Sequence, residues 1–264
     1  KNAGTYKVTV EFKLKPGYEG QYILGDDGGS SLRTELEWTI KPKDLEWNMS
    51  DLEAVGNTRD DDANIYGELG VNGAVDSDVR DGNINTSFPA DNITGVHDKV
   101  AGENKDIALE WKNEDDKFRL EGSAAGNYNL PEELPVVSGS VNEVEELELP
   151  RELKPEEGTE YRMDLETRIS KVPDGLANEY ETPSALEGRL VEEVVKKGIA
   201  PGYVMSYDLA LLSRGDGDSG WQRAEASAIP SAGLTITMPY PEGITGEKYK
   251  GVVAYIYPET INGV

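Results

Sequence analysis

The sequence predicts a mainly β chain in which short strands build β-sandwich modules and one helix lies near the C-terminus. Three observations support this: apolar and polar residues alternate with period two at the start, Gly/Asn/Asp turn segments recur at short intervals, and one amphipathic segment has helix-capping signals at both ends. At 264 residues the chain is long enough for two or three modules, each with a modest core.

Residues 1–43 are predicted to form a small antiparallel β segment. In "TYKVTVEFKL" the apolar side chains fall on one face of a half-buried strand: Tyr6, Val8, Val10, Phe12 and Leu14. A short strand is then expected in "QYILG". A Gly/Asp turn separates it from a further strand that contains Leu32, Leu36 and Trp38. Because two or three strands of this length have little core of their own, we expect the segment to be part of a larger module.

Residues 44–142 consist of short apolar stretches separated by polar loops such as "GNTRDDDAN" and "DSDVRDGN". The expected strands lie around "NIYGELGV", "KDIALEW", "KFRLEG" and "VVSGSV". Turn signals at this spacing are typical of a β-sandwich, so we predict one here.

Residues 143–264 begin with a proline- and glutamate-rich stretch, which we interpret as a domain junction. A helix is expected at about residues 183–197, with Thr182 as N-cap, Pro183 in the first position and Gly198 after its end. Strands are predicted in "EYRMDLETRI", "VMSYDLALL", "LTITMPYP" and "YKGVVAYIYP". This segment is therefore expected to be a second sandwich that carries one helix.

Composition excludes several classes of function. The 51 acidic and 26 basic residues give a formal charge of -25, which repels nucleic acid and anionic membrane surfaces. The absence of cysteine excludes disulfides, thiolate metal sites and cysteine nucleophiles. No apolar run approaches the ~20 residues of a membrane span, and the first residues do not resemble a signal peptide.

Two stretches of the chain resemble a known family. "AGTYKVTVEF" followed by "LEWTI", and "LEGSAAGNYNLP" followed by "VSGSV", are similar to the closing strands of immunoglobulin-like repeats of the YDG or MBG type. These repeats occur in tandem on the surface proteins of bacteria, including Gram-positive anaerobes. Residues 172–257 resemble another module of such proteins, through "YDLALL", "GDG" and "PSAGLTITMPYPEGITG". The resemblance implies tandem immunoglobulin-like modules in an extracellular, wall-attached parent protein.

The resemblance also implies roles for several residues. Tyr128 is expected to place its ring in a sandwich core with its hydroxyl at the rim, and Gly126 to allow the close turn before it. Trp38, Trp111 and Trp221 are expected to be structural as well, since each lies in or beside a strand. An intramolecular Lys–Asn cross-link, known in bacterial stalks built from such modules, remains open.

The sequence offers few candidates for catalysis. His97 is the only histidine and is expected to be an exposed loop residue. No G-x-S-x-G motif is present, and with 51 acidic residues carboxylate pairs arise by chance. We therefore predict that the chain is not an enzyme and that it has no organic cofactor.

Calcium is the one cofactor that the loops leave open, because carboxylates gather in "DSDVRDGN" and "GDGDSG". The candidate ligands are Asp76, Asp78, Asp81, Asp216 and Asp218. Neither loop fits an EF-hand, since Arg80 falls on the third ligand position of the first and Ser227 on the twelfth position of the second.

The predicted function is that of a noncatalytic stalk, spacer or adhesin-like display segment on a bacterial cell surface. One alternative is a module that binds carbohydrate or host proteins, with Trp38, Trp47, Trp111 and Trp221 as a stacking platform for glycans or extracellular-matrix proteins. Another is an accessory segment of a large extracellular glycoside hydrolase. Solvent exposure of the tryptophans discriminates between a structural and a binding role.

Overall fold

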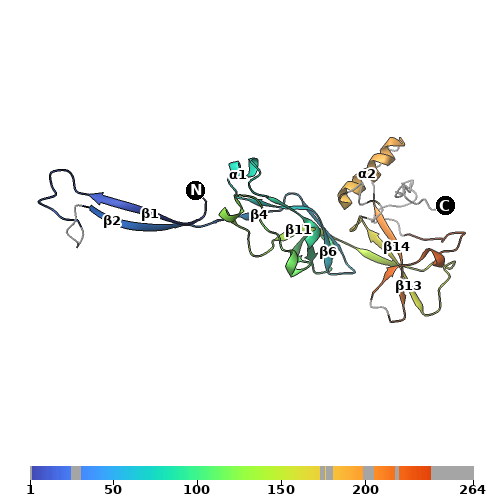
Figure 1. Cartoon of the computed structure of the whole chain (residues 1–264). Coiled ribbons are helices and arrows are strands. Elements are labelled where there is room, and N and C mark those ends of the chain that lie inside the picture. Colours follow the sequence, from blue (N-terminus) through green and yellow to red (C-terminus); the bar gives the residue numbers. More distant parts are fainter. Residues whose placement is uncertain are drawn as a thin grey trace. The chain divides into compact units, whose positions relative to one another are not determined.

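The computed structural model describes residues 2–24, 31–172, 176, 181–198, 205–217 and 220–238 (Figure 1). Strands predominate over helices in these residues, which confirms the mainly β fold class. None of the described helices is long and apolar enough to cross a membrane.

The chain groups into two compact units that alternate along the sequence. Unit 1 comprises Lys1–Ser50, Leu69–Phe88 and Phe118–Glu133. Unit 2 comprises Asp51–Glu68, Pro89–Lys117 and Leu134–Val264. The division into modules at residues 43 and 142, expected from the sequence, stays a prediction.

A two-stranded antiparallel hairpin opens unit 1. β1 (Gly4–Lys13) and β2 (Ser31–Ile40) pair over their whole length, from Gly4 opposite Ile40 to Lys13 opposite Ser31. Strands are confirmed at both of these ranges, whereas no strand forms at residues 21–23. The expectation of a half-buried strand is wrong, because Phe12 and Leu36 are 50% and 51% exposed. Two strands alone have no second layer to pack against, so the apolar face of the hairpin stays accessible to solvent.

The remainder of unit 1 is a small core framed by short elements. β3 (Lys43–Asp44) pairs in parallel with β10 (Tyr128–Asn129), and β4 (Glu46–Asn48) pairs with the end of β6 (Asp62–Asn72). β7 (Ser87–Pro89) also pairs with β6. The buried core residues are Leu45, Val71, Ile84, Phe88, Ala124 and Tyr128. The loop "DSDVRDGN" forms a short helix, α1 (Asp76–Arg80), with acidic residues in its first turn.

The strand predicted at residues 117–122 is wrong. Phe118 and Leu120 do pack against the core of unit 1, which explains the apolar pattern. The backbone there bonds to a loop instead of a strand: Arg119 and Glu121 contact the side chain of Asn85, and Asn85 N–H donates to the Glu121 carbonyl. Asparagine side chains thus replace a strand partner.

Five strands of unit 2 form a closed ring. They are β5 (Leu52–Asn57), β6, β8 (Ile93–Val96), β9 (Gly102–Trp111) and β11 (Val136–Asn142). Each strand pairs antiparallel with the next, and β11 returns to β5 through a parallel pair in which Val141 lies opposite Gly56. This ring is a five-stranded barrel, whereas the sequence predicted two facing sheets.

Glycines permit the close approach of strands in the barrel. A Cβ atom on Gly139 would lie 2.4 Å from the Ala54 carbonyl oxygen, and one on Gly95 would lie 2.4 Å from Cγ2 of Ile107. The buried side chains of the barrel strands are mostly aliphatic and include Ala54, Val55, Ile93, Ile107, Leu109, Val137 and Val141. Apolar filling of this kind makes the barrel a packed core.

A second sheet and a helix complete unit 2. The sheet order is β12 (Val144–Leu147), β13 (Thr159–Thr167), β14 (Tyr207–Gly215) and β15 (Gln222–Arg223), all antiparallel. The predicted helix is confirmed as α2 (Pro183–Lys196): the Thr182 hydroxyl accepts from Ala185 N–H at 3.1 Å. No strand forms at residues 234–238, and the strand expected at residues 248–257 lies outside the described residues.

Candidate functional site

The Tyr128 side chain lies in the core of unit 1 and is only 6% exposed. Its hydroxyl donates a hydrogen bond to Asp78 at 2.6 Å and accepts one from Val75 N–H at 3.0 Å. Because the Asp78 carboxylate accepts the hydroxyl proton, it raises the pKa of Tyr128. Gly126, two residues earlier, belongs to a 3₁₀ turn with open space around its Cα.

Two of the candidate calcium ligands, Asp78 and Asp81, use their carboxylates in other contacts, and Asp76 begins the short helix α1. Asp78 accepts from Tyr128, and Asp81 accepts from Arg80 Nε at 3.3 Å. The backbone N–H of Asp216 donates to the Gly158 carbonyl, and Asp218 lies outside the described residues. Within the described part of the chain, no three His, Cys, Asp or Glu side chains gather closely enough to hold a metal ion.

The tryptophans pack against different neighbours within their units. In unit 1, Trp38 stacks on Tyr6 with 5.9 Å between ring centroids, while Trp47 contacts Phe88 and Phe118 edge-on. In unit 2, Trp111 is half-buried at the end of β9. The guanidinium groups of Arg162 and Arg214 both lie over the Trp221 ring, 4.6 Å and 4.8 Å from its centroid. Only Trp38 is as much as 40% exposed.

An open groove of about 900 Å³ in unit 1 runs beside the segment 125–132. Apolar side chains of Phe118, Leu120, Tyr128 and Leu130 line it together with the charged residues Asp44, Arg119 and Glu132. Phe118 stacks on Phe88 with 4.8 Å between the ring centroids. The groove thus combines an aromatic ring with carboxylates, groups that can contact a sugar.

The expectation of an exposed His97 is wrong, because its side chain is 8% exposed. The ring lies against the backbone of Gly56, where a Cβ atom would be 2.1 Å from Nε2. Nδ1 accepts from Lys99 N–H at 3.1 Å, and Nε2 has no hydrogen-bond partner among the residues that the structure describes. Glycine at position 56 thus makes the space for a buried imidazole, which sequence patterns do not show.

An ion-pair cluster around the buried carboxylate of Asp164 connects the barrel to the second sheet of unit 2. Asp164 on β13, with a side chain 9% exposed, accepts from Arg59 and from Arg162, each at 2.8 Å. Arg59 follows barrel strand β5, and it also reaches Glu146 on β12 at 3.5 Å. Asp164 therefore holds one arginine from each side of the connection.

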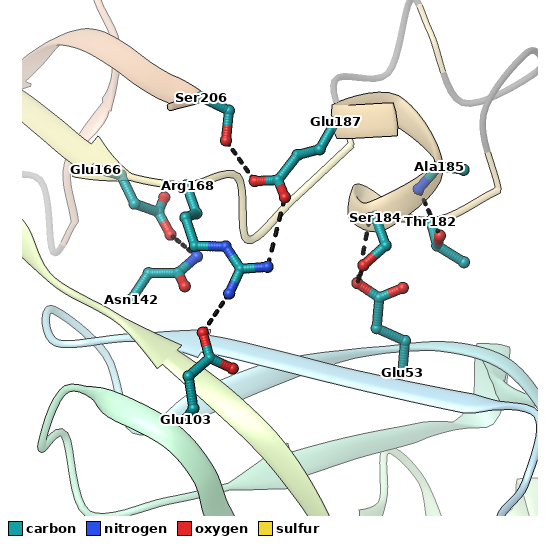
Figure 2. A network of polar contacts seen from close by, with 10 residues as sticks. All are labelled: Glu53, Glu103, Asn142, Glu166, Arg168, Thr182, Ser184, Ala185, Glu187 and Ser206. Atoms are coloured by element: carbon teal, nitrogen blue, oxygen red, sulfur yellow. Dashed lines mark hydrogen bonds and ion pairs between the residues drawn. The ribbon is translucent and has the colours of Figure 1, made fainter. Parts of the chain in front are cut away.

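A second group of polar contacts lies between the barrel, β13 and α2 (Figure 2). Arg168 pairs with Glu103 of the barrel and with Glu187 of α2, and Ser206 donates its hydroxyl proton to Glu187. At the start of α2, the N–H and hydroxyl of Ser184 both donate to Glu53 of β5, at 3.2 Å and 2.8 Å. A carboxylate at a helix N-terminus also interacts favourably with the helix dipole.

One buried and two partly buried hydrogen bonds add to these contacts between the barrel and the segment from β13 to Ser170. Asn142 of β11 donates to Glu166 of β13 at 3.1 Å, and burial raises the pKa of Glu166. The Ser170 carbonyl accepts from Asn64 at 3.3 Å and from the Tyr66 hydroxyl at 3.1 Å. We use the term polar joint for the following residues: Arg59, Tyr66, Asn142, Asp164, Glu166, Arg168 and Ser170.

No sequence pattern indicated the polar joint. "EYRMDLETRI" was recognised as an alternating strand, but Asp164 and Glu166 lie on it as ordinary polar positions in a chain with 51 acidic residues. Only their pairing with Arg59 and Asn142, more than twenty positions away in each case, distinguishes them.

Comparison of the chain with protein-family models, curated proteins and solved structures found no match.

Proposed function

We propose that the chain is a noncatalytic segment of a bacterial cell-surface protein that acts as a stalk or spacer, or displays an adhesive face outside the cell wall. The resemblance to immunoglobulin-like repeats of Gram-positive surface proteins motivates this proposal, including the tandem sandwich architecture of the parent. The function requires successive folded parts that keep their connections under load.

The observation that best supports a spacer is the polar joint. The barrel and the second sheet are joined through one short connection between Asn142 and Val144, a link that would bend freely without further contacts. The 2.8 Å bond from Arg59 to Asp164 and the bonds from Asn64 and Tyr66 to the Ser170 carbonyl hold the two parts against each other. Ion pairs shielded from water resist screening by salt better than exposed ones.

A binding screen of the whole chain tests the noncatalytic spacer function. The purified 264-residue chain is applied to arrays of mucin glycans, plant polysaccharides and extracellular-matrix proteins, with and without calcium. We expect no saturable binding while circular dichroism shows a folded β protein. Saturable binding would contradict the spacer function and would indicate an adhesin or a binding module.

The groove beside Phe118 favours one alternative, a carbohydrate- or host-protein-binding module. If this alternative holds, Arg119→Ala and Glu132→Ala remove charged groups from the groove and weaken binding of the array ligand. Arg80→Ala is a matched control, because Arg80 is an exposed arginine of the same unit that does not line the groove. Equal effects of Arg119→Ala and Arg80→Ala would exclude the groove as the site.

A further inference from the structure

The hairpin β1–β2 presents an apolar face that is interrupted by one polar residue, Thr34, opposite Val10. Paired positions put Tyr6 opposite Trp38, Val8 opposite Leu36 and Phe12 opposite Leu32. Five of these side chains are 40% to 51% exposed: Val8, Phe12, Leu32, Leu36 and Trp38. Apolar patches of this kind are uncommon on soluble monomers and mark sites of association.

The opposite face of the hairpin is polar, and its basic and acidic side chains form ion pairs with each other. Lys7 lies 3.3 Å from Glu37, while Arg33 and Lys13 both reach Glu11, at 3.3 Å and 3.0 Å. The two strands contain three basic and three acidic residues. Residues 1–43 as a whole carry seven basic and six acidic residues, whereas the chain has a net charge of -25.

This charge distribution indicates which partner fits the apolar face. Two copies of a chain with charge -25 repel each other over most of their surface. The hairpin is the segment where that repulsion is absent and apolar surface is present. A cationic partner, by contrast, would be drawn to the acidic residues beyond position 43.

We propose that the apolar face of hairpin β1–β2 is a self-association surface, on which a second copy of this chain packs its own hairpin face to face. The product is a four-stranded, two-layered β structure with a twofold axis, in which the layers lie about 10 Å apart. A twofold axis requires a self-complementary surface, and two identical apolar faces meet this requirement. The inference does not depend on the proposed spacer function.

The size of the face sets the expected strength. The five exposed side chains present roughly 400 Å² of apolar surface, if each contributes two fifths or more of an area of roughly 150–250 Å². Two such faces bury about 800 Å² in total, which is less than the roughly 1,200 Å² of stable specific interfaces and is in the range of weak, transient ones. We therefore expect a reversible dimer with a dissociation constant on the order of micromolar or weaker.

Sedimentation equilibrium of the whole chain, from about 1 to about 500 μM, tests this proposal across the expected range of dissociation constants. We expect a monomer–dimer equilibrium that tightens as sodium chloride rises from about 0.05 to about 0.5 M, because salt screens the repulsion between the acidic residues. A monomer at all concentrations overturns the proposal. Association that weakens with salt also overturns it, since attraction between opposite charges would then hold the copies together.

Two variants with the same change in charge separate the faces of the hairpin. Leu36→Lys puts a cation on the apolar face and is expected to weaken the dimer at least about tenfold, because the charge loses its water on association. Thr9→Lys puts the same charge on the polar face and is expected to leave the dissociation constant within about threefold. Equal effects of the two variants contradict face-to-face packing.

Leu36→Lys also weakens association if it unfolds the hairpin, so amide hydrogen exchange of the unsubstituted chain provides a second test. In the unsubstituted chain, protection of the amides in β1 and β2 is expected to rise with protein concentration, because dimerisation covers a hairpin that is marginal by itself. Protection that does not change with concentration contradicts the dimer. Assemblies larger than a dimer contradict it too, since they indicate edge-to-edge pairing of open strands.

Discussion

Tyr128 and Asp78 are joined by a 2.6 Å hydrogen bond that fixes the short helix α1 to the core of unit 1. A five-residue helix has too few internal bonds to persist by itself. Its position therefore depends on the Tyr128 hydroxyl, which also accepts from Val75 N–H at the start of the helix. The segment 121–131 is thus architectural: it delivers a buried ring with one polar group placed to hold a neighbouring loop.

Removal of the Tyr128 hydroxyl is expected to destabilise unit 1. Tyr128→Phe leaves the Asp78 carboxylate and the Val75 N–H without their partner and is expected to cost about 1.5–3 kcal/mol in the free energy of unfolding. Tyr128→Ala also removes the buried ring and is expected to cost about 3–5 kcal/mol. Urea denaturation measures both values. An unchanged midpoint for Tyr128→Phe would show that the bond contributes nothing.

Closure of the barrel is expected to depend on Gly139. Gly139→Ala places a methyl group 2.4 Å from the Ala54 carbonyl oxygen and 2.5 Å from Cδ1 of Ile107, so β11 and β5 must separate, at a cost of about 1–3 kcal/mol. Gly126→Ala is the matched control, because nothing lies within 4 Å of its Cβ position. Thermal unfolding compares them, and equal melting temperatures would contradict the closed ring.

The burial of Glu166 makes the free energy of unfolding depend on pH, and the raised pKa determines the direction of this dependence. Burial raises its pKa above 4.5, and the nearby Asp208 adds to the increase. The folded state then binds the Glu166 proton more tightly than the unfolded state. The stability from this proton is fully present below pH 4.5 and is lost as the pH rises through the folded-state pKa.

Glu166→Gln isolates this contribution, because glutamine keeps an oxygen that accepts from Asn142 but has no charge to bury. The free energy of unfolding of the variant, relative to the unsubstituted chain, is expected to increase with pH above 4.5 and then to level off. Glu145→Gln, which removes the same charge at an exposed position on β12, serves as the control. A flat difference for Glu166→Gln would rule out the raised pKa.

The polar joint is expected to couple the unfolding of the barrel to that of the second sheet. Asp164→Ala removes the carboxylate that Arg59 and Arg162 share. It is expected to lower the free energy of unfolding by about 3 kcal/mol, because these partly buried charges lose their partner. Calorimetry is expected to show one transition for unit 2 in the unsubstituted chain and two in the variant.

Arg80→Ala provides the control for the joint. Its ion pair with Asp81 is exposed, with side-chain exposures of 74% and 55%, and is expected to contribute less than about 1 kcal/mol. If Asp164→Ala behaves like Arg80→Ala, the joint does not hold the two parts together.

Local features of this protein followed from its sequence. The alternation from Tyr6 to Leu14 predicted strand β1, and Thr182, Pro183 and Gly198 predicted both ends of α2 to within one residue. Periodicity and capping depend on neighbours within a few positions, so a single sequence contains this information. The acidic composition and the lack of cysteine were likewise fixed without a structure.

Pairings between distant residues were decided by the tertiary structure. The same spacing of short strands suits two facing sheets or a closed ring, and the parallel pairing of β11 with β5 selects the ring. Asp164 and His97 became distinctive only when Arg59 and Gly56 were brought beside them. The reason is physical: sequence patterns report which face of an element is apolar, whereas burial of a charge or an imidazole depends on what the fold places opposite.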